Sequence, residues 1–356
     1  MTEPKAPDNA RFLENEVLKS ITQKPSQSDF DKHINEMYAD VAKRRAAMRS
    51  EGENPDISRH SLDRSASHLR RFLTEHYAAQ ADLLNRTLFC EFPTGSLNAE
   101  TVAVSSGFLV LINSGISPFL RQVCEVIVRF ERDSEGSIHP TEETISILAD
   151  IFYAYISYGS SLAGPALLSG GESGLLAGTL AMACWHFVLC HEYGHIAAGH
   201  LEADGSRNML PTPKGKVAVL SRQQEEEFQA DAIGYKISLE TPSLKTIDTS
   251  TLDRVLDGRF SGEDFAKAMR LKSALAAPYI FFSIVLVLEE IWSRSAKPSD
   301  DNALVQTHPP AKERIRGLAP VLFSLDVRHR SFASFGGKLG SIREEIAALV
   351  CDRLHR

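Results

Sequence analysis

Ten residues in the middle of the chain, HEYGHIAAGH at 191–200, contain three histidines and one glutamate. On an α-helix, residues four apart share a face, so His191 and His195 can point their imidazoles at one position. Zinc in proteins prefers nitrogen ligands and tetrahedral coordination, and a catalytic site keeps one position for water. Glu192 is the candidate base for that water. The spacing predicts a hydrolytic zinc site, although a pair of helical histidines is by itself more often structural.

A third ligand is needed, and His200 is the first of two choices. It follows Gly199, which indicates a helix end. If the helix ran on unbroken, nine residues would place His200 on the face opposite His191. We therefore expect His200 to be a polar residue just after the helix stop rather than a ligand.

The second choice lies in SRQQEEEFQADAIGYKI at 221–237, where Ser221 and Gln224 resemble a capping box that opens a helix. Glu227 and Asp231 are four apart and share a face of that helix. One carboxylate can bind the metal, while Asp231 can accept the second N–H of a ligand histidine and so fix its orientation. A solvated helix start would account for the run of glutamates, but less well for an aspartate at the border of an apolar face.

Four segments, in this order along the chain, resemble one family. NAETVAVSSGFLVLINSGI (98–116), HEYGH (191–195), EFQAD (227–231) and THPPAKERIRGL (307–318) are similar to motifs of the gluzincin metallopeptidases that include the CAAX prenyl endopeptidases and HtpX-like heat-shock proteases. The first segment departs from the family at Glu100 and Ser106, where Phe and Gly are usual. His200 matches a histidine often present just after H-E-x-x-H in that family.

The resemblance implies a zincin-like fold in which His191, His195 and Glu227 bind Zn²⁺, Glu192 is the general base and Asp231 orients a ligand. The implied reaction is hydrolysis of a peptide bond in a protein or peptide substrate. The spacing of about 75 residues between the strand segment and His191 is longer than usual, and the transmembrane helices of the membrane members are not evident. This indicates a soluble, divergent branch whose substrate does not carry over.

The oxyanion that forms during hydrolysis needs a hydrogen-bond donor besides zinc. His308 and Tyr193 are the two candidates. Pro309 and Pro310 fit the first turn of a helix, so His308 either only marks that helix start or, as the resemblance implies, lies beside the zinc cleft. There it would donate to the oxyanion or occupy the open metal position in a resting state. An extended substrate would pair with the edge of a strand at 102–112.

The surrounding patterns predict an α+β protein, mostly α, with a small antiparallel sheet or hairpin at 88–116 and a buried helix carrying HEYGH. Helices are expected at 30–49, 61–85, 118–132, 141–159, 175–198, 222–239, 263–292, 309–318 and 340–355. We divide the chain into an N-terminal helical region (1–85), a zinc metallopeptidase domain (86–320) and a C-terminal helical segment (321–356).

Composition limits the class of partner and the cellular compartment that we expect for this protein. A net charge of −7 gives no reason to expect nucleic acid as a partner. Five scattered cysteines and the lack of a signal-peptide pattern favour reduced thiols in a cytoplasmic protein. The apolar run Ala274–Leu288 has 15 residues and contains Pro278, so we expect a buried helix rather than a membrane span. The sequence does not indicate the oligomeric state.

Two alternatives stay open. One is a defence or toxin protease that resembles the phage-exclusion peptidase Lit and has one specific protein target. The other is a non-catalytic zinc-containing protein that binds a partner. Glu192 favours an enzyme, because a purely structural zinc site has no use for a base and closes its fourth position.

Overall fold

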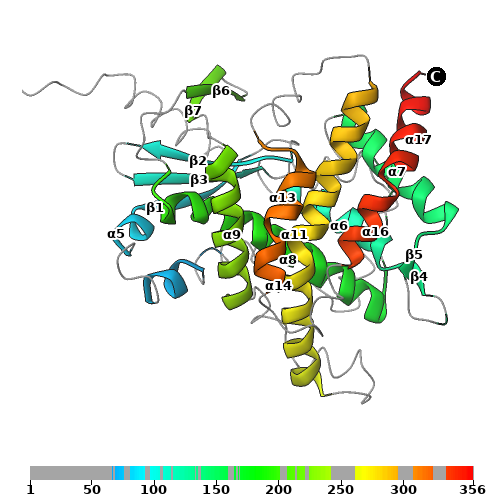
Figure 1. The fold of residues 1–356 in the computed structure, drawn as a ribbon, viewed down its shortest axis with the longest axis horizontal. Helices are drawn as coiled ribbons and strands as arrows, with labels where there is room; N and C mark the ends of the chain where they lie inside the picture. Colours follow the sequence, from blue (N-terminus) through cyan, green and yellow to red (C-terminus); the bar gives the residue numbers. More distant parts are fainter. Residues whose placement is uncertain are drawn as a thin grey trace, which may run out of the picture.

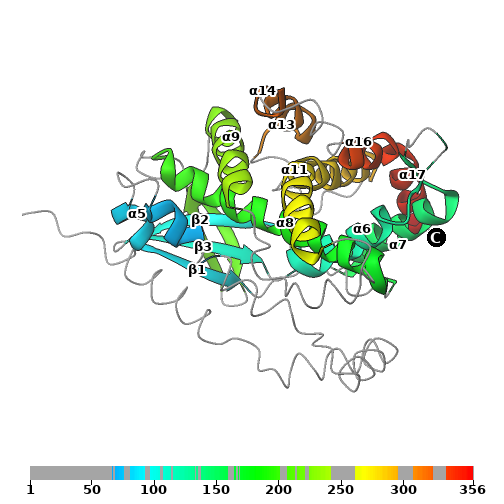
Figure 2. The same cartoon turned by 90° about the horizontal axis from the view of Figure 1, so that it is seen from below.

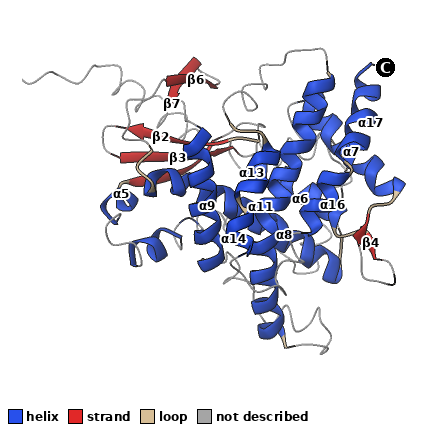
Figure 3. Ribbon diagram, in the orientation of Figure 1, coloured by secondary structure: helices blue, strands red, loops and turns tan. Residues whose placement is uncertain are grey.

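The structure, a computed structural model, describes residues 66–355 with gaps, the longest of which cover 76–80, 159–163, 201–206, 242–260, 296–307 and 324–333. Helices dominate these residues, and the strands are short (Figure 3). The expected class, mostly α with a minor β part, is confirmed. The predicted helix at 30–49 lies outside the described residues. Of the one predicted at 61–85, the structure describes helical residues at 69–75 and α5 (Ala81–Asn85).

The main sheet has three strands, β1 (Thr87–Phe92), β2 (Ala99–Val104) and β3 (Gly107–Asn113), in the order β1-β3-β2. β2 and β3 form the expected antiparallel hairpin, in which Thr101 is opposite Val110. β1 pairs with the other side of β3 and runs parallel to it. β3 is therefore central, and β2 lies at an edge of this sheet.

Further strands occur where the sequence patterns predict only helices. β4 (Glu131–Arg132) pairs with β5 (Ile138–His139), and β6 (Arg207–Thr212) pairs with β7 (Gly215–Leu220). The sequence patterns indicate 88–116 as the β region and only helices after residue 117, so these two strand pairs were not predicted. Strands of two residues are too short to show a period, and Pro211 within β6 lowers its strand signal.

Seven helices in the described part of the chain lie within about five residues of their predicted ranges. They are α6 (Ile116–Ile127), α7 (Glu142–Tyr158), α8 (Gly171–Ala197), α9 (Gln224–Glu240), α11 (Gly262–Arg294), α13 (Ala311–Gly317) and α17 (Arg343–His355). Two further helices, α14 (Ala319–Phe323) and α16 (Ser334–Ser341), were not predicted. Ser221, the predicted N-cap of α9, lies outside the described residues.

Helix α8 is the centre of the molecule and packs against α6, α9, α11 and β2. Figures 1 and 2 show the three-stranded sheet at one end, the helices α7, α16 and α17 at the other, and α8, α9 and α11 between them. From Leu180 to Ile196 almost every side chain of α8 is buried, as expected of a helix that is apolar on all sides. HEYGH therefore lies on a rigid element inside the protein.

The C-terminal helices belong to the same core. α16 and α17 pack against α11, and α17 also packs against α7. Leu339, Ile346 and Val350 are fully buried and join the hydrophobic cluster that contains much of α8. Residues 334–355 are thus packed as part of the main body.

Helices α8 and α11 are each long and apolar enough to cross a membrane by length and composition. In each helix, 72% of the most apolar 18-residue stretch is buried inside the protein. The run Ala274–Leu288 belongs to α11, which has 33 residues and continues through Pro278. Beside this proline, which cannot donate a helical hydrogen bond, the Tyr235 hydroxyl donates to the Leu275 carbonyl (3.2 Å).

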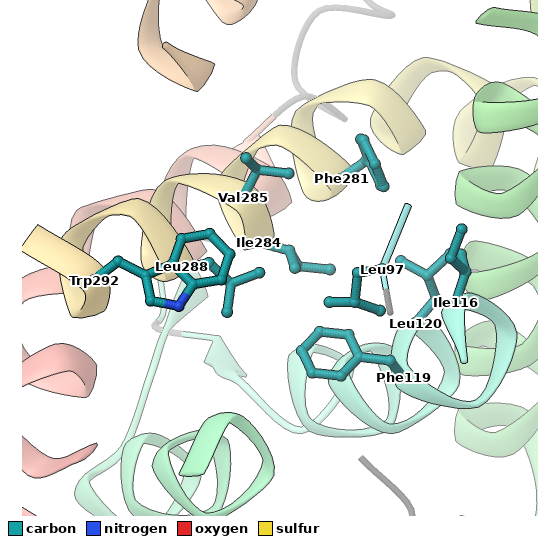
Figure 4. A pocket seen from close by; sticks show the side chains of 9 residues that line it. All are labelled: Leu97, Ile116, Phe119, Leu120, Phe281, Ile284, Val285, Leu288 and Trp292. Carbon is teal, nitrogen blue, oxygen red and sulfur yellow. The ribbon is translucent and has the colours of Figure 1, made fainter. Parts of the chain in front are cut away.

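An apolar pocket lies between α6 and α11 (Figure 4). Nine hydrophobic or aromatic side chains surround it, among them Phe119, Phe281 and Trp292. None of the residues that the sequence singles out for chemistry lines this pocket. The candidate chemistry is instead where α8 crosses α9.

Candidate metal centre

Three predicted ligands from two helices meet at one point. His191 and His195 come from α8 and Glu227 from α9, and one ligand atom of each lies within 4.8 Å of the others. The two histidine Nε2 atoms are 3.2 Å apart. Glu227 oxygens lie 3.6 Å from the Nε2 of His191 and 3.5 Å from that of His195. All three residues are buried, so this group could hold a metal ion away from bulk solvent.

Two glycines let the helices approach closely enough to form this cluster. A Cβ atom on Gly194 of α8 would lie 2.7 Å from the carbonyl oxygen of Ala230. A Cβ atom on Gly234 of α9 would lie 2.7 Å from both the N and the Cα of His191. The two backbones are therefore in direct contact, and this contact brings Glu227 beside the histidines.

Asp231 has the position that the sequence predicts for it. Its Oδ1 lies 2.9 Å from the Nδ1 of His191. The Nδ1 of His191 thus faces Asp231, and Nη2 of Arg314 lies 3.5 Å from the same nitrogen. The other ring nitrogen, Nε2, faces His195 and Glu227 and is the candidate ligand atom.

Arg314 of α13 holds Asp231 from the other side. Its Nε and Nη2 donate to the two carboxylate oxygens at 2.8 and 2.6 Å. Burial would lower the pKa of Arg314, but the carboxylates of Asp231, Glu227 and Glu192 raise it, so this guanidinium stays charged. Sequence reasoning did not single out Arg314, although it lies in the THPPAKERIRGL segment.

The chain turns sharply after α8. Gly199 has a φ of 74°, the left-handed region that favours glycine. The N–H of His200 donates to the carbonyl of His195, and the N–H of Gly199 to that of Ile196, both at 3.1 Å. This is a Schellman motif, which brings the residue after the glycine back over the last helical turn. His200 therefore lies just after the helix stop, as the sequence predicts, and not on the face opposite His191 that an unbroken helix would give it.

The turn places His200 against a ligand rather than in the ligand set. The Nδ1 atoms of His200 and His195 are 2.9 Å apart, and the Nε2 of His200 lies 3.0 Å from Oε1 of Gln229. The amide oxygen accepts from Nε2–H of His200, so the Nδ1 of His200 accepts from His195. His195 then keeps the lone pair on its own Nε2. Neither contact was predicted from the sequence.

The chemistry of the donor set tests whether the cluster fits a cation. The two imidazole Nε2 atoms and the two oxygens of Glu227 face one another at 3.2–3.6 Å. Imidazole nitrogens and carboxylate oxygens are groups that bind divalent metal ions in proteins. The donor set therefore fits a metal ion.

The charge state of Glu227 also suits a ligand. Burial alone would raise its pKa, but His308, His191 and Arg314 lower it, and the net pKa is well below the usual value. Glu227 is therefore ionised at neutral pH. A metal-binding carboxylate must be deprotonated.

His308 lies at the same cluster, two residues before Pro310, the N-cap of α13. Its Nδ1 is 2.9 Å from Oε2 of Glu227, an ion-pair distance without the alignment of a hydrogen bond. Glu289 of α11 fixes the start of α13 by accepting the N–H of Ala311 at 2.9 Å. His308 therefore lies at a helix start and beside the predicted ligands at the same time.

The candidate base, Glu192, is 2% exposed and has one oxygen on the metal side: Oε1 is 4.0 Å from the Nε2 of His191. Its other oxygen accepts from the hydroxyl of Thr101 on β2 at 2.7 Å. Tyr193, the other candidate oxyanion donor, lies in the hydrophobic core, and burial raises its pKa to about 12. Of the two candidates, the structure brings only His308 to the ligand cluster.

Comparisons with known proteins add no assignment. Searches against protein-family models, curated proteins and solved structures found no match to this chain. The interpretation of the site therefore depends on its own geometry.

Proposed function

We propose that this chain is a zinc-dependent metalloendopeptidase. The observation that carries the proposal is the cluster of His191, His195 and Glu227, with the Glu192 carboxylate beside it. Three protein ligands leave one position of a tetrahedral metal open, which is typical of catalytic rather than structural zinc sites.

Zinc is the metal that this donor set favours. Two imidazoles and one carboxylate suit zinc, whereas calcium and magnesium prefer oxygen ligands alone. Tetrahedral zinc with bonds of about 2.05 Å holds neighbouring ligand atoms about 3.3 Å apart. In this chain the two Nε2 atoms are 3.2 Å apart; the nitrogen of His191 lies 3.6 Å from Oε2 of Glu227 and that of His195 lies 3.5 Å from Oε1.

The roles of the side chains follow from their positions. Bound zinc would supply a Lewis acid and lower the pKa of a water to about 7. The Oε1 atom of Glu192 would accept a proton from the attacking water, and Glu192 would pass this proton to the leaving amine. Asp231 and His200 fix the two imidazole rings. His308 donates to the oxyanion of the tetrahedral intermediate.

The substrate is an extended segment of a peptide or protein, bound along β2. The substrate was expected to pair with a strand at 102–112, a range that covers parts of β2 and β3. β3 is the central strand, so the edges of this sheet are β2 and β1. β2 is the one that contacts Glu192, through Thr101. A peptide that adds to this edge would gain main-chain hydrogen bonds with little demand on its sequence. We place the enzyme in the cytoplasm, since the described cysteines are free thiols.

The test combines metal analysis with digestion of an unbiased peptide pool, read by mass spectrometry. The full chain should bind about one zinc, and His195→Ala and Glu227→Ala should lose it. Glu192→Gln should keep zinc and fold but lose hydrolysis, because it removes the base at nearly constant shape. Glu225→Gln, an exposed carboxylate on α9, is the matched control and should remain active. Hydrolysis by Glu192→Gln, or full zinc content in both ligand variants, would refute the proposal.

A further inference from the structure

Thr101 is a buried residue whose hydroxyl contacts the proposed base from the sheet. Its side chain comes from β2, which packs against α8, and the residue is 2% exposed. Its Oγ1 lies 2.7 Å from Oε2 of Glu192 and 3.3 Å from the Glu192 carbonyl oxygen. Both of these partners accept hydrogen bonds, so the threonine is the donor. The shorter contact is the one to the carboxylate.

The two oxygens of Glu192 thus have different surroundings. Oε2 accepts the hydroxyl of Thr101, while Oε1 faces the ligand cluster, 4.0 Å from the Nε2 of His191. A carboxylate at the end of two methylene groups has several rotamers, and a fixed donor on one oxygen selects among them. The strand is a rigid support for that donor, since Thr101 is in register with Val110 of the central strand.

We infer that Thr101 is a positioning residue for the base: its hydroxyl holds Oε2 so that Oε1 faces the open metal position. The inference rests on the proposed function and deepens it. Thr101 touches neither the metal ligands nor the substrate in this role and acts only through Glu192. In this arrangement β2 has two roles: its edge is the proposed binding site of the substrate, and its Thr101 side chain supports the base. One strand therefore aligns the substrate with the base.

The experiment compares three substitutions in the zinc-loaded full chain. Thr101→Val removes the hydroxyl and keeps the shape, and Thr101→Ser keeps the hydroxyl. Misplacing a reacting group by about 1 Å can cost roughly 100-fold in rate, so we expect Thr101→Val to lower kcat by about 10- to 100-fold, with KM and zinc content unchanged. Thr101→Ser should recover most of the lost rate. Thr179→Val, a buried threonine elsewhere on α8, is the matched control and should behave like the wild type.

Several results would overturn the inference. One is a wild-type kcat in Thr101→Val, and another is an equal loss in Thr101→Ser, which would point to shape rather than to the hydroxyl. If Thr101→Val does not fold, Thr101→Ala removes the same hydroxyl with less crowding. Failure of both to fold would mean that the residue serves the fold rather than Glu192.

Crystal structures separate this inference from the proposed function. If the wild-type chain binds zinc but hydrolyses no peptide, the proposed function fails and the role of Thr101 can still be decided. We expect one orientation of the Glu192 carboxylate in the wild type and in Thr101→Ser, and more than one, or a rotated one, in Thr101→Val. An unchanged single orientation in Thr101→Val would overturn the inference.

Discussion

Replacing Gly234 by alanine adds one methyl group where α8 and α9 are in close backbone contact. The new Cβ would lie 2.7 Å from the backbone N and Cα of His191, whereas ordinary contacts begin near 3.4 Å. No side-chain rotation relieves a contact with backbone atoms. The helices must therefore separate by about 0.7 Å, and protein metal sites tolerate ligand displacements of only about 0.2 Å.

The shift moves Glu227 and Asp231 together, because both are on α9. We expect Gly234→Ala to weaken zinc binding by at least about 10- to 100-fold, the range for losing a single supporting hydrogen bond. Global stability should change less. Overpacking costs about 1–3 kcal/mol, and alanine recovers about 1 kcal/mol of helix propensity.

The assay is competition for zinc against a chelating dye, with thermal unfolding measured on the same samples. Gly337→Ala is the matched control, since Gly337 is exposed on α16 and a Cβ there meets nothing within 4 Å. It should leave zinc affinity unchanged and stabilise the fold slightly. Wild-type zinc affinity in Gly234→Ala would refute the argument that this crossing sets the ligand positions.

Three further predictions concern the surroundings of the site. Asp231→Asn should lower zinc affinity by roughly 10- to 100-fold in the same dye competition, because it weakens the hold on His191; unchanged affinity and activity would make Asp231 an ordinary helix carboxylate. His308→Ala should slow peptide hydrolysis by roughly 100- to 1,000-fold with zinc retained, if the imidazole donates to the oxyanion. Faster hydrolysis by His308→Ala would show that His308 blocks the metal position instead. Intact activity with a small loss of stability would show that His308 serves only the start of α13. Burial raises the pKa of the Glu289 carboxyl above 4.5, although the N–H of Ala311 and the charge of Arg314 lower it. The folded state therefore binds a proton on Glu289 more tightly than the unfolded state does. The free energy of unfolding should therefore fall as pH rises from about 4.5 through the raised pKa, and Glu289→Gln should gain stability relative to wild type over that window in urea titrations; a pH-independent difference would contradict this.

Much of the ligand cluster could be predicted because its geometry is local. His191 and His195 share a face of one helix, and Glu227 and Asp231 share a face of another, so each pair needs only helical spacing. The boundaries of the long helices came close because glycine, proline or polar residues flank long runs of helix-forming residues.

The supporting contacts could not be predicted, because they join residues far apart in the chain. Thr101 reaches Glu192 across 91 positions and Arg314 reaches Asp231 across 83. Nothing in helical or strand periodicity says which residues meet at that range. His200 is a different case, because Gly199 signals a Schellman turn, and that turn would have placed His200 over His195.

The hydrogen bonds that Arg314 donates to Asp231, and the 2.9 Å contact between Asp231 and the Nδ1 of His191, join α13, α9 and α8 in one continuous chain. This makes metal occupancy and the docking of α13 thermodynamically linked. A metal that binds His191 shifts the docking equilibrium of α13 toward the docked state. Docking of α13 raises the affinity of the site for that metal by the same factor. A metal that binds only the folded chain would add stability in proportion to the logarithm of its free concentration, about 4 kcal/mol at a thousand times the Kd. Chelation should therefore release α13 before it unfolds the rest, and the concentration of free metal would set how firmly this helix closes the site.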